Sequence, residues 1–213
     1  MVDQRGGKRL TLDVIDGNLP AFTLYQQLGF EHYSSSVDLE FKPENLTAES
    51  LPEPVLPAGY ACAPLEPFDW RSRMELEQRI SPPGLLKYEP IEERRFRRPG
   101  VMRLLRPVLL AAEGTYDEDY ILRTVEDGQI VGRYGYSASR RGKGLNQVRL
   151  ALDPAHAALA AYMVASALRG VLHYGPGLRV ECTVPQWNEA LLEACEAAGF
   201  QQRVAYCRMG MVL

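Results

Sequence analysis

The sequence has few cysteines and histidines, four and three among 213 residues. They are Cys62, Cys182, Cys195, Cys207, His32, His156 and His173. The cysteines form no CxxC pair, and no histidine stands at metal-ligand spacing from another histidine or from a cysteine. We therefore predict no metal site, and we interpret the cysteines as small buried apolar residues in a reducing compartment.

The sequence also lacks long apolar runs and an excess of basic residues. No apolar run approaches the length of a membrane span, and residues 1–20 contain no signal-peptide core. The formal net charge of -3 does not favour nucleic-acid binding, which needs a basic surface. With 46% hydrophobic and 24% charged residues, the composition is typical of a soluble globular protein. We expect a cytoplasmic protein that binds neither nucleic acid nor a membrane.

One segment, residues 42–59, is rich in proline and reads "KPENLTAESLPEPVLPAG". It has few large apolar residues and neither a helical nor a strand period, which is typical of a linker. We interpret residues 43–57 as a Pro-rich linker between an N-terminal piece, residues 1–42, and a C-terminal piece, residues 58–213.

The two pieces share a strand-helix-strand repeat. In the first, "RLTLDVI" alternates as a half-buried strand does, "AFTLYQQLGF" carries a helical stripe that ends at Gly29, and "SSSVDLEF" alternates again. "LRVECTVPQWNEALLEACEAAGFQQRVAYCRM" repeats this order in the second piece. Asn18, Gly29 and Phe30 correspond to Asn188, Gly199 and Phe200 at a constant offset of 170. We interpret these coincident identities as a duplication.

The C-terminal piece supplies further elements ahead of its repeat unit. The patterns predict a strand near residues 59–67, a helix over 67–80 with Phe68 and Leu76 near one face, helices over 90–112 interrupted near Pro99 and Pro107, a hairpin over 120–139 that turns at Asp127 and Gly128, a strand over 145–152 and an apolar helix over about 155–172. This order indicates an α/β (α+β) protein with a mixed central sheet flanked by helices.

The stretch "NLPAFTLYQQLGF", residues 18–30, resembles the closing motif of the GNAT acyltransferases, the acetyl-CoA-dependent N-acetyltransferase superfamily. The matching residues are Asn18, Ala21, Leu24, Tyr25, Leu28, Gly29 and Phe30. The resemblance implies the GNAT fold. Residues 58–213 then resemble one complete but degenerate GNAT domain, and residues 1–42 resemble the C-terminal third of another, as in a tandem GNAT protein whose first domain is incomplete.

The resemblance also implies a chemistry, the transfer of an acetyl group from acetyl-CoA to an amine of unknown identity, in a small molecule or a peptide. A tyrosine after the fifth strand of the family often protonates the leaving thiolate, which makes Tyr25 the candidate catalytic residue and Asn18 a candidate cofactor-binding residue. The family holds the cofactor diphosphate on backbone N–H groups where the helix after strand four begins, in a Gly-rich loop.

The stretch "RRGKG", residues 140–144, looks like this loop, but the pattern around it argues against that role. Val148, Leu150 and Leu152 alternate with polar or small neighbours after it, so we predict a hairpin tip between two strands. The loop position is then "DPAHAALAA", residues 153–161, with Leu152, Ala155, His156 and Ala157 as candidate cofactor-binding residues. This stretch has no glycine, and the residue at the position of Tyr25 in the second unit is Cys195.

Three functions stay open: an N-acetyltransferase that uses Tyr25, a catalytically inactive GNAT-fold scaffold, and a small-molecule binding module that uses the cleft between strands four and five. A unit of about 40 residues cannot bury a core alone. We therefore expect residues 1–42 to pack against the C-terminal piece, or against a second copy in a homodimer, by sheet-edge pairing. We expect one of three explanations: the gene begins before residue 1, the chain is a truncated form, or a half-domain survives as an appendage.

Two polar clusters allow a structural and a functional interpretation. "EERRFRR", residues 92–98, is either a solvated helix face with Glu-Arg pairs or a clamp for an acidic group. Tyr116 and Tyr120 either flank a strand at the surface or line a substrate groove.

Overall fold

The computed structural model describes residues 8–43, 46–66, 69–97, 108, 110 and 112–213. The strands are β1 (Arg9–Ile15), β2 (Glu31–Phe41), β3 (Tyr60–Pro64), β4 (Thr115–Thr124), β5 (Ile130–Ser139), β6 (Asn146–Leu152), β7 (Val180–Pro185) and β8 (Gln201–Val212). The helices are α1 (Leu19–Gln27), α2 (Trp70–Ile80), α3 (Pro83–Tyr88), α4 (Glu93–Phe96), α6 (Ala160–Tyr174) and α7 (Glu189–Ala197), with the 3-10 turns η2 (Ala48–Ser50) and η3 (Pro154–Leu159).

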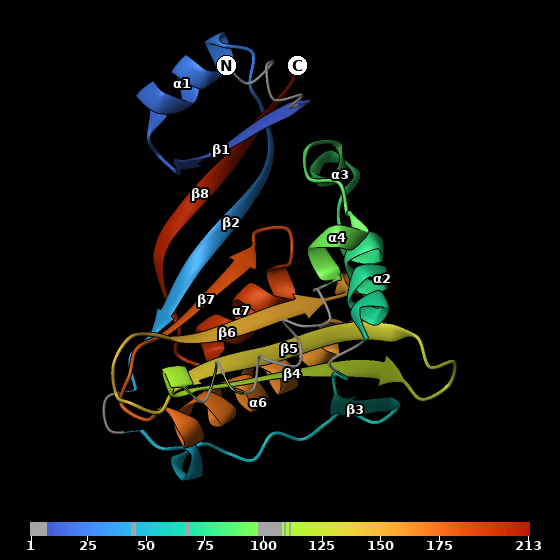
Figure 1. Cartoon of the computed structure of the whole chain (residues 1–213), viewed down its shortest axis with the longest axis vertical. Helices are drawn as coiled ribbons and strands as arrows, with labels where there is room; N and C mark the ends of the chain where they lie inside the picture. Colours follow the sequence, from blue (N-terminus) through green and yellow to red (C-terminus); the bar gives the residue numbers. More distant parts are fainter. Residues whose placement is uncertain (1–7, 44–45, 67–68, 98–107, 109, 111) are drawn as a thin grey trace.

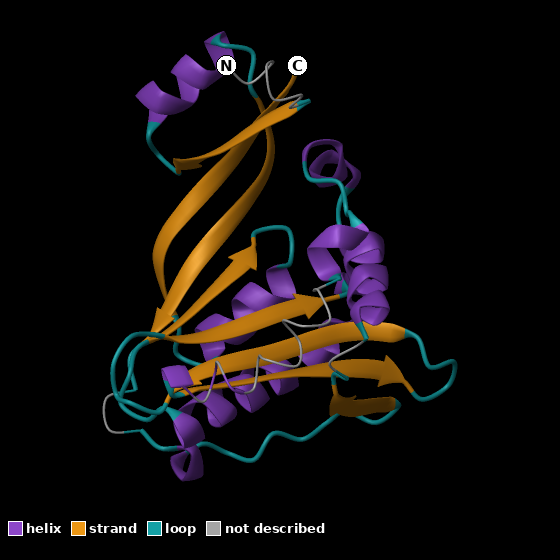
Figure 2. Cartoon of the chain, in the orientation of Figure 1, coloured by secondary structure: helices purple, strands orange, loops and turns teal. Residues whose placement is uncertain are grey.

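All eight strands form one sheet in the order β1-β8-β2-β7-β6-β5-β4-β3. Among the described strands, only β6 and β7 pair in parallel, and the other neighbours pair antiparallel. Helices pack on this strongly twisted sheet, as Figures 1 and 2 show. The predicted fold class, a mixed sheet flanked by helices, is confirmed.

The two faces of the sheet carry different helices because successive strand residues point to opposite faces. Ala151 of β6 belongs to a small apolar cluster with Leu76 of α2. The next residue, Leu152, belongs to the main core with Met163 of α6. Helix α6 therefore covers one face and α2 the other.

Helix α6 begins later than the sequence predicts. Residues 154–159 form the 3-10 turn η3, because His156 has non-helical dihedral angles (φ -115, ψ 38), and the α-helix begins at Ala160. The expectation that no apolar run could cross a membrane needs a correction, since Pro154–Tyr174 has the length and the hydropathy of a span. The buried side chains of α6, which include Met163, Ala167 and Val171, pack on the sheet, as in the core helix of a globular protein.

The predicted repeat is present in the structure. Helices α1 and α7 begin 170 residues apart, and so do β2 and β8. Asn18 and Asn188 cap the two helices by accepting the amides of Ala21 at 3.2 Å and Leu191 at 3.4 Å. Both helices end before a glycine in the left-handed region, Gly29 at φ 90 and Gly199 at φ 93, where other residues are strained.

The two repeat units exchange their last strands. Strand β2 lies between β7 and β8, and β8 lies between β1 and β2. Ser36 pairs with Pro185, and the residues 170 positions from each, Tyr206 and Ile15, also pair with each other. The first unit therefore packs against the C-terminal piece, as expected, but its last strand is inserted inside the sheet rather than added at an edge.

The pairing of β2 with β8 has an internal twofold symmetry. Ser36 pairs with Tyr206, its own counterpart at the offset of 170, so a pseudo-twofold axis passes through this pair. The pair Glu31 and Gly210 is related in the same way to the pair Glu40 and Gln201. The register shifts on the two sides of the axis also correspond, one after His32 and one after Asp38.

The symmetry ends at the two helices. In α7, Leu191 and Cys195 are 1% and 0% exposed. No residue of α1 is buried, and its Leu19 and Leu24 and the following C-cap residue Leu28 are 52–70% exposed. Strand β1 ends the described sheet, whereas β7, its counterpart, also pairs with β6.

Several local predictions are confirmed. Strand β3, helix α2 and the hairpin of β4 and β5 lie where the sequence predicts them, and "RRGKG" joins the antiparallel strands β5 and β6. Helix α3 was not predicted; Pro83 stands in its first turn, where proline is well tolerated. Phe68, Pro99 and Pro107 lie outside the described residues.

Candidate functional site

Strands β6 and β7 separate partway along their length. They pair from Asn146 with Val180 to Val148 with Cys182, and both strands then continue without pairing to each other (Figure 1). At the far end, a side chain replaces the ladder: buried Asn188 donates its Nδ2 to the carbonyl of Leu152 at 2.8 Å. Beyond Cys182, the sheet is therefore split between these two strands.

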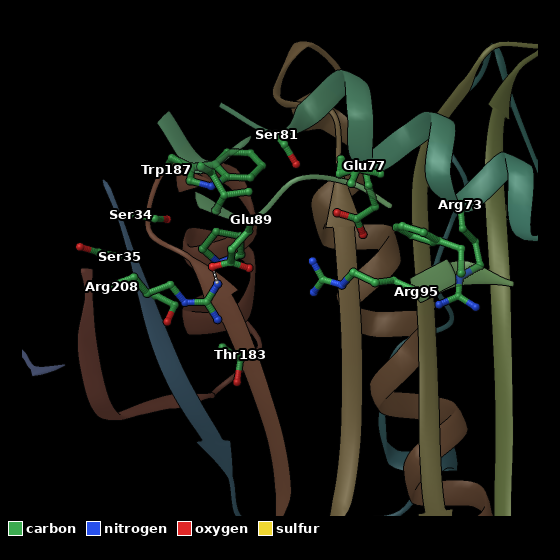
Figure 3. A pocket seen from close by; sticks show the side chains of 15 residues that line it. Ser34, Ser35, Arg73, Glu77, Ser81, Glu89, Arg95, Thr183, Trp187 and Arg208 are labelled. Carbon is green, nitrogen blue, oxygen red and sulfur yellow. Dashed lines mark hydrogen bonds and ion pairs between the residues drawn. The ribbon is translucent and has the colours of Figure 1, made fainter. Parts of the chain in front are cut away.

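A cavity of about 400 Å³ lies on the face of the sheet that carries α2 (Figure 3). Thr183 and Pro185, which follow the last residue of β7 that pairs with β6, form part of its wall. The exchanged strands contribute Ser34–Ser36 of β2 and Arg208 of β8. Helix α2 contributes Arg73 and Glu77, and the segment from α3 to α4 contributes Glu89 and Arg95. We call this space the splay cavity.

Most charged groups of the splay cavity are paired. Glu89 accepts from Arg208 at 3.0 Å and from the Tyr33 hydroxyl at 2.6 Å. Burial, together with the Glu89 carboxylate, raises the pKa of Tyr33, so this phenol stays protonated. Glu77 has a looser partner, since its carboxylate lies 3.8 Å from Arg133.

Two donors at the cavity wall have no partner among the described residues. The guanidinium of Arg95 makes no hydrogen bond and no ion pair within this part of the chain, and it points into the cavity in Figure 3. The indole N–H of Trp187 is buried and equally without an acceptor among these residues. Buried donors in folded proteins nearly always have partners, so the Trp187 indole N–H is available to a ligand. Arg95 is an exposed residue, and its guanidinium is available because no carboxylate of the described chain pairs with it.

Comparisons with known proteins show where this architecture occurs. No family model and no curated protein match the sequence. A tandem GNAT protein from the clavulanic acid biosynthesis pathway, solved without AcCoA, superposes with a TM-score of 0.60 at 13% identity, covering 99% of this chain and 66% of that one. A GCN5-related N-acetyltransferase from Sphaerobacter thermophilus gives 0.61 at 15% identity, covering 99% and 64%. The chain has the GNAT fold. It spans about two thirds of the length of these two proteins.

In GNAT terms, β6 and β7 are the fourth and fifth strands, so η3 and the residues before it occupy the cofactor-loop position. This region does not fit a diphosphate. The Asp153 carboxylate accepts the Ala155 amide at 3.0 Å and pairs with Arg79 at 3.0 Å. A diphosphate at this helix end would meet that negative charge, and it would find the Ala155 amide already bonded.

The other predicted cofactor residues here are also engaged. His156 Nδ1 is 2.9 Å from the Tyr60 hydroxyl, and the Leu152 carbonyl accepts from Asn188. Ala155 and Ala157 carry methyl groups where the family has glycines that admit the diphosphate.

Asn18 and Tyr25 belong to the first repeat unit, whereas the other predicted cofactor residues, 152–157, lie at the end of β6 and in η3. Asn18 caps α1, and Tyr25 packs its half-exposed ring edge-on against Phe30, with ring centroids 5.7 Å apart. Neither is among the described residues that line the splay cavity. Cys195, the counterpart of Tyr25, is fully buried beside Cys182, so it fills the core.

The structure shows where the residues of both polar clusters lie. Glu92 pairs with Arg94, and Glu93 pairs with Arg97 at 3.2 Å, as on a solvated helix face, whereas Arg95 faces the cavity. Arg98 lies outside the described residues. Tyr116 and Tyr120 do not line the cavity among the described residues: their hydroxyls bond Glu118, and Tyr116 stacks on Tyr174 at 3.5 Å.

Sequence reasoning missed Glu77, Glu89, Trp187 and Arg208 as cavity residues. They come from four separate segments, and only tertiary pairing brings them together. The acidic-clamp interpretation of "EERRFRR" was the one available signal, and it pointed to the segment that contains Arg95.

Proposed function

We propose that this chain is part of an acetyl-CoA-dependent N-acetyltransferase that binds its amine acceptor in the splay cavity. The observation that carries the proposal is the coincidence of a polar cavity with the split between β6 and β7. Through this split, a thioester on the α6 face would come within reach of an amine on the α2 face. The similarity to GNAT structures supports the reaction class.

On the acceptor side, Glu77 is the carboxylate that fits the role of holding the incoming ammonium. It lines the cavity, it is half-buried, and its only ion pair in the described chain is the 3.8 Å contact with Arg133. A carboxylate within hydrogen-bond reach of the ammonium can also accept a proton from it, directly or through one water. Glu89 fits this role less well because its charge is already compensated by Arg208 at 3.0 Å, with Tyr33 donating to the same oxygen.

Acetyl-CoA, when bound, supplies the acetyl group as a thioester. Because residues 152–157 do not fit its diphosphate, we place its binding site outside them and derive no step from them. Tyr25 does not line the splay cavity, so we retain it as the candidate general acid only for a composite site that the first repeat unit would form with further residues.

The direct test is titration calorimetry with acetyl-CoA, followed by an assay of thiol release with an amine present. The proposal expects heat on binding and thiol release, and no heat at millimolar acetyl-CoA would contradict it for this chain. Asp153→Asn removes the negative charge and keeps the shape, so unchanged acetyl-CoA affinity is expected if the cofactor binds elsewhere. A gain in affinity would place the cofactor at η3 after all.

Tyr25→Phe tests the assignment of the general acid. Removal of a positioned general acid costs about a hundredfold or more in kcat, with KM for acetyl-CoA unchanged. Tyr206→Phe, on β8, is the matched loss of a phenol and should leave kcat unchanged. Equal rates for Tyr25→Phe and the wild type would remove Tyr25 from the mechanism.

A second candidate function is a GNAT-fold binding module without transfer. The bonded Ala155 amide and the buried Cys195 in place of a tyrosine favour it. It predicts that amines bind in the cavity while thiol release stays at the uncatalysed rate, including in the presence of saturating acetyl-CoA.

We further propose that residues 1–42 are the C-terminal third of a second GNAT domain, joined by residues 43–57 to the domain of residues 58–213. The shared register, the equal caps and the uncovered face of α1 support this division. The match covers 66% of the tandem GNAT protein, so that protein is long enough to contain the rest of a first domain as well.

A further inference from the structure

We infer that the splay cavity selects an amine that also carries an anionic group, in the simplest case an amino carboxylate. The inference rests on the proposed function for calling the ligand an acceptor, but the binding preference is a property of the cavity and needs no transfer. The expected preference follows from the charged side chains of the cavity. Some are compensated by other residues, and others are not.

The anionic group would be held by Arg95. In "EERRFRR", Glu92 and Glu93 are taken by Arg94 and Arg97, so neither neutralises Arg95. The guanidinium points into the cavity and has no ion pair among the described residues (Figure 3). A guanidinium presents a planar fork of donors, and its natural partner is a carboxylate or phosphate bound through two hydrogen bonds.

Arg73 of α2 also lines the cavity, and its guanidinium carbon lies 5.9 Å from the centre of the Phe96 ring. In Figure 3 its guanidinium lies apart from that of Arg95, so the anionic group is assigned to Arg95 alone.

The cationic group would be held by Glu77. Among the glutamates of the wall, Glu89 has its charge compensated by Arg208 at 3.0 Å, and Tyr33 donates to the same oxygen, Oε1. Glu77 keeps most of its acceptor capacity, because its one ion pair in the described chain spans 3.8 Å and is no hydrogen bond. An ammonium would complete its coordination.

A ligand with both charges satisfies both groups at once. An amine alone leaves Arg95 without an anion, and a carboxylate alone leaves Glu77 with only its distant arginine. Hydrogen bonds to charged groups in partly buried sites typically change affinity by about tenfold to a hundredfold each. We expect a preference of that size for the doubly charged ligand over each singly charged analogue.

The test uses three probes of equal chain length, 6-aminohexanoate, hexylamine and hexanoate, and their four-carbon equivalents. Binding to the whole chain is measured by NMR titration without acetyl-CoA. The expected result, at one chain length or both, is that the amino acid binds at least about tenfold more tightly than either analogue. Equal binding of the amine and the amino acid, or no binding of any probe, would overturn the inference.

Two variants assign the preference to its residues. Arg95→Gln should bind 6-aminohexanoate and hexylamine equally, and Glu77→Gln should bind 6-aminohexanoate and hexanoate equally. Arg94→Gln and Glu75→Gln are matched controls, because neither residue lines the cavity among the described positions, and both should keep the wild-type preference. A preference that survives Arg95→Gln would contradict the assignment.

The proposed acetyltransferase function and the inferred binding preference can fail separately. If the amino acid is preferred but no thiol is released with acetyl-CoA, the inference stands and the acetyltransferase proposal falls. If hexylamine and 6-aminohexanoate are acetylated with equal KM, the enzyme proposal stands and the inference falls.

Discussion

At the scale of single residues, a cluster of tyrosine hydroxyls outside the cavity surrounds Glu118 on β4. Its carboxylate accepts the hydroxyls of Tyr116, of Tyr120 at 2.5 Å and of Tyr136 at 2.8 Å. Burial raises the pKa of Glu118, but the three hydroxyl donors outweigh burial and the pKa lies below its ordinary value. Burial and the nearby carboxylate raise the pKa of Tyr120 to about 12. The cluster therefore consists of a carboxylate ion held by neutral phenols.

This arrangement makes Glu118 a residue that stabilises the folded protein. Glu118→Gln keeps the shape but removes the charge that strengthens three hydrogen bonds, so we expect a loss of about 1–2 kcal/mol in the free energy of unfolding. Urea unfolding at neutral pH measures it. Glu126→Gln, in the exposed hairpin turn, should stay within about 0.5 kcal/mol of the wild type, and an equal effect of both substitutions would contradict the account.

The effect of Glu118 should depend on pH in one direction. A carboxyl whose folded pKa is lowered stabilises the protein above its unfolded pKa, about 4.3, and this contribution is lost as the pH falls through the folded pKa. The difference between the wild type and Glu118→Gln should therefore narrow below about pH 4. A difference that stays constant down to pH 3 would show that the charge contributes nothing.

At the scale of elements, helices α1 and α7 have the same caps and length but different surroundings. The 9-residue helices end at equivalent glycines, yet α7 packs on α6 and α1 has no buried residue. The same local sequence pattern therefore produces two similar helices, and among the described residues only α7 is covered by tertiary contacts.

This contrast predicts unequal costs for similar substitutions. Leu191→Ala in α7 removes a side chain that is 1% exposed and should cost about 2–5 kcal/mol in the free energy of unfolding. Leu24→Ala in α1, where the leucine is 52% exposed, should change it by less than about 0.5 kcal/mol. Thermal and urea unfolding of both variants tests the pair, and a large cost at Leu24 would mean that α1 is covered in solution.

The elements that the sequence predicted well are those with local causes. Asn18, Gly29 and their counterparts determine where a helix begins and ends from within a few residues, so the repeat could be recognised from sequence alone. Helix α6 began five residues late because its first turn is distorted at His156, which no periodicity reports. Alternation in β2 predicts that Val37, Leu39 and Phe41 are buried, but it does not say which strands flank them.

At the scale of the whole molecule, the exchanged strands make one sheet from two repeat units. The predicted linker joins them over the core: Ala48 is 4% exposed in the main core cluster, and Arg169 of α6 donates to the Leu51 carbonyl at 2.8 Å. The cavity was not predictable because it depends on this exchange, which brings Ser34–Ser36 beside Arg208 and Thr183.

Because of the exchange, residues 1–42 should remain bound after the linker is cut. Val55 is 83% exposed, so a protease site inserted after Glu53 would be accessible. After cleavage, we expect both fragments to elute together and to separate only in denaturant, since β2 is hydrogen-bonded on both sides. Release of the N-terminal fragment in native buffer would contradict the inserted strand.

The most direct test of the strand exchange, on which the cavity depends, uses one substitution. Ser35 of β2 pairs with Cys207 of β8, and the two side chains interact. Directly opposed antiparallel residues lie within the distance range of a disulfide. Ser35→Cys should therefore form a disulfide with Cys207 within one molecule under mild oxidation, as mapped by peptide mass spectrometry. Ser34→Cys, whose partner is Arg208, and the wild type should not. Free thiols at both positions, or a bond that joins two molecules, would contradict the account.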